Sequence, residues 1–252
     1  NTGVIVDKLS NYNATTYNNP SHTGGKVGDY SLSFNGNTQY LGIQGKNYTT
    51  VGALDELTIC LWFQTSYEGG TWNNNWAFFD YDRSEYFNFF IRPDIGPDNG
   101  KLGFSTSRSG IDDFYSETGG FNDGDWHYAV AVYDGTNKYI YIDPSSGQPD
   151  ATDLNSHSGL AIGTGTSRYG IIGDGSEATS VGTPRNNIYY QGEMDEIRYY
   201  ERALSGQEIE WLFKDYKLST SLNEEQQQLA QVIFTCYDVD GRIVPNAEIS
   251  LI

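Results

Sequence analysis

Two carboxylates stand at alternate positions near the end of this sequence. Glu193 and Asp195 belong to the segment GEMDEIRYY, which reads as a β-strand because of its aromatic and β-branched residues. Side chains at i and i+2 of a strand point to one face, and a retaining glycosidase needs two carboxyl groups about 5 to 5.5 Å apart. The pair is therefore a candidate for glycoside hydrolysis. Alternatively, Asp195 and Glu196 could form surface ion pairs with Arg198 or Arg202.

Aromatic and acidic residues also gather in the central loops, in a combination that suits a sugar. An aromatic face can cover the apolar C–H patch of a pyranose ring, while Asn, Asp and Arg side chains satisfy its hydroxyl groups. Taken one at a time, these residues have simpler explanations. Trp76 and Phe79 could be core residues, the consecutive asparagines could form a turn, and the aspartates could be solvated. As a group they predict a ligand-binding face made of Trp72, Asn74, Trp76, Asp80, Tyr81, Asp82, Arg83, Asp98, Asn99, Asp112, Asp113 and Tyr115.

The elements that must position these groups are short strands separated by Gly, Asn, Asp and Ser clusters, a pattern typical of a β-sandwich. The DGTN sequence at residues 134–137 predicts a hairpin turn, because glycine supplies the positive φ that such a turn needs. Helix is expected to be scarce, since 15% of the residues are aromatic. We expect strands at residues 87–93, 101–107, 127–134 and 138–143, and polar loops at residues 67–75, 94–100, 107–125 and 144–187.

Four segments occur in an order that resembles laminin G-like domains of the concanavalin A-like lectin and glucanase superfamily. They are YSLSFNGNTQYLGI at 30–43, LTICLWFQT at 57–65, the W-H hairpin at 123–143 and GEMDEIRYYERALSGQEIEWLF at 192–213. In the last segment, Ser205 and Glu208 form a capping box that predicts a helix of about one to two turns. The resemblance covers residues 1–213 and implies an all-β, two-sheet antiparallel jelly-roll sandwich with one short C-terminal helix.

The resemblance also bears on the two carboxylates. Domains of this kind mostly bind ligands, and an acid on the closing strand resembles a structural calcium ligand, which would be Asp195 with Asp7 as its partner. The laminarinase-like glycoside hydrolases of the superfamily carry E-x-D-x-x-E at this point, whereas Arg198 stands here in place of the third acid. The resemblance therefore implies a calcium-binding domain that is not an enzyme, in which His127 of the W-H hairpin satisfies backbone partners.

The net charge of the chain favours some classes of binding partner and argues against others. A formal net charge of −18 argues against nucleic acid, whose phosphates would be repelled, and favours calcium or a solvated acidic surface. We expect Cys60 and Cys236 to be unpaired thiols, because Cys60 lies inside an apolar strand. No apolar run approaches the roughly 20 residues that span a bilayer. These features predict an extracellular or cell-surface protein that is not membrane-spanning.

The character of the chain changes after residue 213. Residues 214–231 are polar and read as a linker or helix, and residues 232–252 read as two strands around a DVDG turn. This second segment resembles the opening hairpin of an immunoglobulin-like or transthyretin-like repeat, and such a hairpin is marginally stable by itself. We expect it to pack on the sandwich or to begin an Ig-like repeat. Because the chain opens with Asn1 and carries no signal peptide, we expect it to be a piece of a longer polypeptide.

These expectations combine into one functional prediction. The chain is expected to be a non-catalytic, calcium-dependent carbohydrate-binding module of a larger extracellular protein, with a microbial surface adhesin as its setting. Its ligand would be a glycan or polysaccharide, and its other partners would be neighbouring domains of the same polypeptide. The alternatives are a module appended to a secreted polysaccharide-degrading enzyme, a protein-binding or structural spacer, and a diverged glycoside hydrolase.

Overall fold

The computed structural model describes most of the chain: residues 4–5, 13–47, 53–68, 76–93, 96–166, 168–175 and 188–221, with the backbone alone for 44–47 and 215–221. Asp7, Trp72, Asn74 and Cys236 lie outside the described residues, as does the hairpin expected at 232–252. In the part of the chain that is described, no helix is long and apolar enough to cross a membrane.

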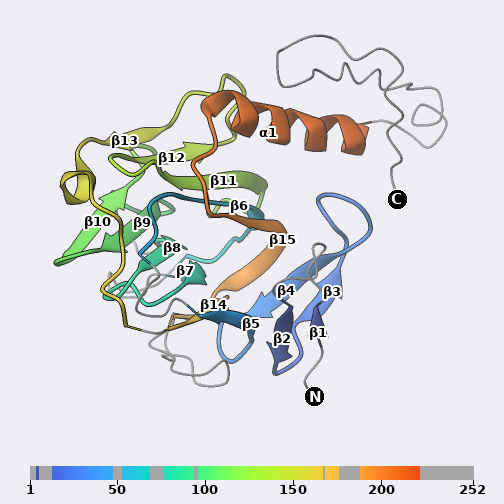
Figure 1. Ribbon diagram of the computed structural model, residues 1–252. Coiled ribbons are helices and arrows are strands. Elements are labelled where there is room, and N and C mark those ends of the chain that lie inside the picture. Colours follow the sequence, from blue (N-terminus) through green and yellow to red (C-terminus); the bar gives the residue numbers. More distant parts are fainter. Residues whose placement is uncertain are drawn as a thin grey trace, which may run out of the picture.

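The described residues form two antiparallel sheets (Figure 1). The eight-stranded sheet has the order β1 (Val4–Ile5), β2 (Ala14–Tyr17), β5 (Tyr40–Asn47), β14 (Tyr169–Ile172), β7 (Trp76–Asp80), β8 (Phe87–Ile91), β9 (Leu102–Ser107) and β10 (Ile111–Tyr115). The seven-stranded sheet has the order β13 (Ala151–Asp153), β12 (Lys138–Ile142), β11 (Trp126–Tyr133), β6 (Leu57–Gln64), β15 (Gln191–Tyr200), β4 (Ser31–Asn35) and β3 (Ser21–Thr23). With the helix α1 (Gly206–Ser221), this arrangement confirms the predicted sandwich.

An aromatic and aliphatic core fills the space between the sheets. Phe87 and Phe89 of β8 enter it from the eight-stranded sheet, and Ile59, Leu61 and Phe63 of β6 enter it from the other. Each of these side chains is at most 1% exposed. Full burial of such a side chain contributes about 1.5–3 kcal/mol, so the alternation of inward residues along these strands holds the two layers together.

The helix α1 lies over the seven-stranded sheet (Figure 1), and a second apolar layer lies between the two. The Phe213 ring of α1 stacks on Trp62 of β6 and on Tyr128 of β11, with centroid distances of 5.7 and 5.9 Å. Cys60 lies in this layer as a free thiol, and burial raises its pKa to about 11. The prediction of an unpaired Cys60 is confirmed. Because β6 is buried on both faces, its sequence is a continuous apolar run rather than an alternating one.

The predicted capping box starts α1. The Ser205 hydroxyl accepts a hydrogen bond from the N–H of Glu208 at 3.3 Å, and the Glu208 carboxylate accepts one from the N–H of Ser205 at 2.8 Å. The helix then continues to Ser221 and is longer than the one to two turns that its sequence pattern suggests. Ile209 and Phe213, one turn apart, are the buried residues that dock it on the sheet.

Three strands occur in segments that read as loops in the sequence. β10 falls within residues 107–125, and β13 and β14 fall within residues 144–187, so the loop prediction is wrong at these places. β10 and β13 are edge strands, and an edge strand in contact with water needs no regular apolar alternation. β14 has four residues, and its one glycine, Gly170, weakens its strand signal.

A buried lysine joins the two sheets at one edge of the sandwich. The side chain of Lys138, in β12, is 0% exposed, and its Nζ donates to the carbonyl oxygen of Asp112, in β10, at 2.9 Å. Nζ also lies 3.1 Å from the Asp112 carboxylate and 3.5 Å from that of Asp153. Burial lowers the pKa of Lys138, and the two carboxylates oppose this effect. Since β10 and β12 belong to different sheets, these contacts close the edge between them.

We expect Lys138→Ala to lower the free energy of unfolding by about 3 kcal/mol, the low end for a broken buried ion pair. The low end applies because the Asp112 and Asp153 side chains remain 37% and 31% exposed. The matched control is Lys214→Ala, which removes an exposed pair with Glu210 and should change stability by about 0.5 kcal/mol or less. Urea denaturation measures both variants, and equal effects would contradict the role of Lys138.

Gly103 of β9 leaves room for the Phe90 ring of β8. A Cβ atom at this position would stand 2.2 Å from the Phe90 Cζ atom. We therefore expect Gly103→Ala to lower the free energy of unfolding by about 1–3 kcal/mol through overpacking. Gly110→Ala is the control, because its Cβ would meet nothing within 4 Å. Thermal unfolding of the two variants tests this, and an unchanged Tm for Gly103→Ala would count against the contact.

Candidate functional site

The outer face of the eight-stranded sheet carries most of the predicted ligand-binding residues that reach the surface. Phe89 of β8 and Phe104 of β9 point into the core, so the residues that alternate with them point outward. Two outward rows cross β8, β9 and β10: one is Asn88, Ser105 and Asp113, and the next is Phe90, Gly103 and Tyr115. The edge strand β10 thus brings two predicted residues, Asp113 and Tyr115, onto one face.

Tyr115 stands among charged side chains in what we call the Tyr115 cluster, made of Arg83, Arg92, Asp98, Asp113 and Tyr115. The guanidinium carbon of Arg92 lies 5.3 Å from the centroid of the Tyr115 ring. The same guanidinium donates a hydrogen bond to Asp98 at 3.1 Å, and Arg83 pairs with Asp113 at 3.7 Å. The cluster combines a half-buried aromatic ring with two cation–carboxylate pairs.

The charged groups of the cluster act on the Tyr115 hydroxyl. Burial raises its pKa and the nearby Asp113 carboxylate adds to this effect, whereas Arg92 and Arg83 oppose it. The hydroxyl is therefore neutral at physiological pH and can both donate and accept a hydrogen bond. The side chains of Arg83, Asp113 and Asp98 are 34%, 37% and 40% exposed, so a ligand in solution can reach them.

A polar row continues from the cluster toward the middle of the sheet. The Ser105 hydroxyl donates to the Asp113 carboxylate at 2.6 Å. Next to Ser105 lies Asn88, which is 4% exposed and whose side-chain oxygen finds no hydrogen-bond partner among the described residues. Asn88 in turn pairs in register with Asp80 of β7, which is 2% exposed. The row therefore runs from the exposed Asp113 to the buried Asp80.

Two predicted aromatic residues lie in the core. Trp76 is 6% exposed and packs on Tyr67, with ring centroids 4.2 Å apart. Tyr81 is fully buried, and its ring centroid lies 5.6 Å from that of Phe79. The core interpretation that the sequence left open for Trp76 is the one that the structure shows, and neither ring presents a face to solvent.

Three other predicted polar residues hold parts of the fold in place. Asp82 is 1% exposed and accepts a hydrogen bond from Nε of Arg168 at 2.7 Å. Asp112 points away from the Tyr115 cluster and contacts Lys138 across the edge of the sandwich. The Asn99 side-chain oxygen accepts a hydrogen bond at 2.8 Å from an amide of the loop at residues 117–125. These residues support the site rather than line it.

Arg92 is a member of the cluster that the sequence analysis does not single out. It lies within FNFFIRP, where the sequence predicts a strand, and alternation places Asn88, Phe90 and Arg92 on one face. That alternation is the signal that could have found Arg92. Its partner Tyr115 comes from β10, a strand without a clear sequence pattern, so the pairing of the two residues appears only in the structure.

The carboxylates of β15 belong to the other sheet. The Asp195 carboxylate accepts hydrogen bonds from the N–H of Val27 at 2.9 Å and of Glu196 at 2.8 Å. Burial raises the pKa of Asp195, and these two donors oppose the rise. The Glu193 carboxylate accepts a hydrogen bond from the Ser31 hydroxyl at 3.0 Å. Both acids thus tie β15 to the segment before β4 and to the start of β4 itself.

The remaining charges near β15 form ion pairs. Glu196 pairs with Arg198 at 2.7 Å, and Arg202 pairs with Glu208 of α1 at 2.8 Å. In the described part of the chain, no group of three or more His, Cys, Asp or Glu residues is placed to hold a metal ion. Asp7, the expected calcium partner of Asp195, lies outside that part.

A second aromatic group lies toward the other side of the eight-stranded sheet. Tyr17 of β2 stacks on Tyr40 of β5, with centroids 4.6 Å apart. Tyr40 and Ile171 form the buried centre of this group, and Tyr169 and Tyr189 pack around it. Burial raises the pKa of Tyr40 to about 12, and the neighbouring tyrosines add to the effect. These residues come from distant segments, so no sequence motif marks them.

The fold has relatives among solved structures. Domain 4 of AbnA, a GH43 extracellular arabinanase from Geobacillus stearothermophilus, in complex with arabinotriose, aligns with a TM-score of 0.60 and 16% identity over 82% of this chain and 91% of that chain. A SAP-like pentraxin from Limulus polyphemus aligns with a TM-score of 0.50 and 18% identity over 71% and 79% of the two chains.

A structure of botulinum neurotoxin type C aligns with a TM-score of 0.55 and 12% identity; the cell entry of that toxin is described as dependent upon interaction with two ganglioside molecules. The alignment covers 84% of this chain and 48% of that one, so the present chain spans about half its length. At these identities the likeness shows the fold alone.

Comparison at the level of sequence identifies the family. No curated protein matches the chain. Residues 35–210 match the Laminin_G_3 model, which is described as the concanavalin A-like lectin/glucanases superfamily. Because this match covers well over half of the 252 residues, the chain belongs to the Laminin_G_3 family of the concanavalin A-like lectin/glucanases superfamily.

Proposed function

We propose that the chain is a non-catalytic carbohydrate-binding module and that it binds a glycan at the Tyr115 cluster. The observation that carries this proposal is the position of the Tyr115 ring, which lies next to the Arg92 guanidinium at the edge of the eight-stranded sheet. Two carboxylates, those of Asp98 and Asp113, flank the same ring and are accessible to solvent.

Each part of the cluster suits one feature of a sugar. The exposed part of the Tyr115 ring offers apolar surface to sugar C–H groups. Asp98 and Asp113 accept hydrogen bonds from hydroxyl groups, and Arg83 and Arg92 donate to them. Hydrogen bonds to ionised groups are about twice as strong as neutral ones. Because each guanidinium already has a carboxylate partner, the cluster has little net charge, which favours a neutral sugar.

The solved structures with this fold support a sugar as the ligand. One of them is an arabinanase domain in complex with arabinotriose, and another is a toxin described by its interaction with gangliosides. The fold alone is shared with them, so the class of ligand is carried over as part of the proposal.

The environment of the β15 acids supports a role without catalysis. Glu193 is bound by the Ser31 hydroxyl and Asp195 by backbone N–H groups, so both carboxylates already serve the fold. A hydrolase of this superfamily would need a further acid where this chain has Arg198, which pairs with Glu196. We therefore place no reaction at these residues.

The setting that we propose is a larger extracellular protein, with a microbial surface adhesin as the first candidate. A second candidate is a module of a secreted polysaccharide-degrading enzyme, which is favoured by the likeness to a domain of an extracellular arabinanase. The acidic composition suits either setting, because a net charge of −18 keeps a surface-exposed domain soluble.

Calcium remains part of the proposal, through Asp195 and Asp7. We expect calcium to raise the Tm relative to a chelator, because a ligand that binds the native state alone at 100 times its Kd stabilises by about 2.7 kcal/mol. Asp195→Asn should remove the calcium-dependent part of the Tm, while Asp29→Asn at an exposed acid should leave it intact. Differential scanning calorimetry with calcium and with chelator decides, and an identical Tm in the two conditions would remove calcium from the proposal.

Glycan binding is the direct test of the proposed function. On an array that includes neutral arabino-oligosaccharides, we expect the chain to bind at least one glycan with modest affinity. Tyr115→Ala should weaken binding about two- to tenfold, since a stacking ring contributes about 0.5–1.5 kcal/mol beyond its burial. Arg83→Ala should weaken it as well through the loss of hydrogen bonds.

The matched control for Tyr115 is Tyr30→Ala, because Tyr30 is 69% exposed and lies beside β4 of the other sheet. Circular dichroism would establish that each variant is folded. Retained binding in both cluster variants would place the glycan elsewhere. Absence of binding to any glycan by the unaltered chain would favour a protein-binding or structural spacer.

A further inference from the structure

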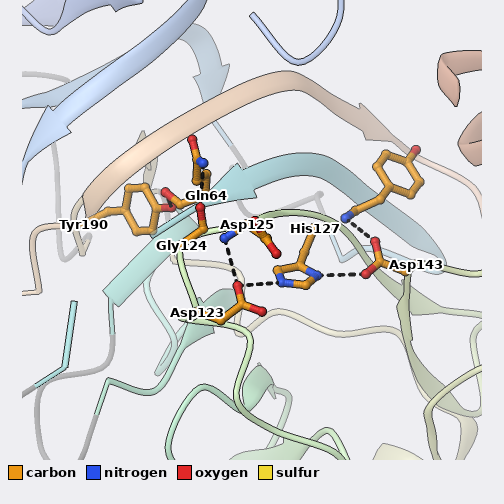
Figure 2. A network of polar contacts seen from close by, with 8 residues as sticks. Gln64, Asp123, Gly124, Asp125, His127, Asp143 and Tyr190 are labelled. Carbon is orange, nitrogen blue, oxygen red and sulfur yellow. Dashed lines mark hydrogen bonds and ion pairs between the residues drawn. The ribbon is translucent and has the colours of Figure 1, made fainter. Parts of the chain in front are cut away.

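His127 lies between two carboxylates from different parts of the fold (Figure 2). Its Nδ1 is 2.8 Å from the carboxylate of Asp143, which follows β12. Its Nε2 is 3.1 Å from the carboxylate of Asp123, in the loop at residues 117–125 that precedes β11. Both ring nitrogens therefore face acids, and the expectation that His127 satisfies backbone partners is wrong.

The protonation state of the ring decides whether both contacts are attractive. A charged imidazole has two N–H donors, one for each carboxylate, whereas a neutral imidazole has one donor and one lone pair. Asp143 is held in place because its other oxygen accepts the N–H of Tyr128 at 2.9 Å. The Asp123 side chain is 48% exposed, and the oxygen that faces Nε2 also accepts the N–H of Asp125 at 2.8 Å. Loss of the proton therefore makes the contact between Nε2 and Asp123 repulsive.

The side chains that pack against the faces and edge of the ring are uncharged. Phe63 of β6 and Phe121 of the loop pack against it, with centroid distances of 5.7 and 5.1 Å. Gln64 of β6 binds the loop at Gly124 through a neutral amide (Figure 2). A further acid of the loop, Asp125, is joined to this network through its backbone N–H, which donates to Asp123 at 2.8 Å.

The two carboxylates set the charge of the ring in the folded chain. Burial by itself lowers the pKa of His127, but hydrogen bonds and charge from Asp143 and Asp123 outweigh it, so the pKa lies above its ordinary value of about 6.5. A raised histidine pKa means that the stabilising contact is fully present below about pH 6.5 and is lost as the pH rises through the folded-state pKa.

The loop that carries Asp123 also holds the turn of the Tyr115 cluster. The N–H of Gly120 donates to the Asn99 carbonyl oxygen at 2.8 Å, and the Asn122 amide donates to the Asn99 side chain at 2.8 Å. Asn99 directly follows Asp98, whose carboxylate binds the Arg92 guanidinium over the Tyr115 ring. A continuous set of contacts thus leads from His127 to the cluster.

We propose that protonated His127 clamps the loop at residues 117–125 and thereby keeps the Asp98 turn, and with it the Tyr115 cluster, in its binding geometry. The clamp closes when His127 gains a proton and loosens when it loses one. As regulation of glycan binding, this inference rests on the proposed function, but the clamp itself can be tested without any glycan.

The test is an NMR titration of the whole chain between about pH 5 and 9. We expect the His127 ring to titrate above about pH 6.5, and the amides of Gly120, Asn122 and Asn99 and the Arg92 Nε signal to shift with the same apparent pKa. His127→Gln should abolish this shared titration. Constant shifts at Asn99 and Arg92 while the His127 ring titrates would overturn the proposal.

Two further variants separate the clamp from general effects of pH. Asp123→Asn should remove the pH dependence of the loop but keep the loop in place, because an amide can accept from the charged ring and donate to the neutral one. His157→Gln removes a half-buried histidine that bonds to Thr106 and should leave the shared titration unchanged. A shared titration that persists in Asp123→Asn, or vanishes in His157→Gln, would refute the clamp. If these signals titrate together in a chain that binds no glycan, the proposed function fails and the clamp stands.

Discussion

The side chains of β6 alternate between two apolar layers, each of which consists of buried residues. Ile59, Leu61 and Phe63 point into the core between the sheets, while Cys60 and Trp62 point into the layer under α1. Because a slip of one residue would exchange the contents of the two layers, the register of β6 with β11 and β15 is strongly specified. The positions of His127 on β11 and Asp195 on β15 follow from that register.

His127 and Asp195 both take their positions from β6. The pairing of β11 with β6 sets His127 opposite Phe63, at the end of the strand where the N–H of Gly124 donates to the Thr65 carbonyl oxygen. The pairing of β15 with β6 sets Asp195 on the same sheet, where it holds the segment before β4. The Tyr115 cluster is linked to this framework through the loop at residues 117–125.

The acidity of the chain acts locally as well as through its net charge. Asp134 caps the DGTN turn by accepting hydrogen bonds from the N–H groups of Thr136 and Asn137; burial raises its pKa, but these bonds outweigh it and the pKa is lowered. Asp82 holds Arg168, and Asp150 holds the start of the loop at residues 117–125. Many carboxylates therefore stabilise loops, whereas those of Asp98 and Asp113 flank the Tyr115 ring.

The sequence by itself determined the features that depend on residues close together in the chain: the strands of the core, the DGTN turn and the capping box of Ser205 and Glu208. It also marked four of the five members of the Tyr115 cluster. Only the tertiary structure decided that Arg92 meets Tyr115 and that Trp76 is buried, because burial and pairing depend on which segments pack together. An edge strand such as β10 has no neighbour on one side, so its sequence carried little of that information.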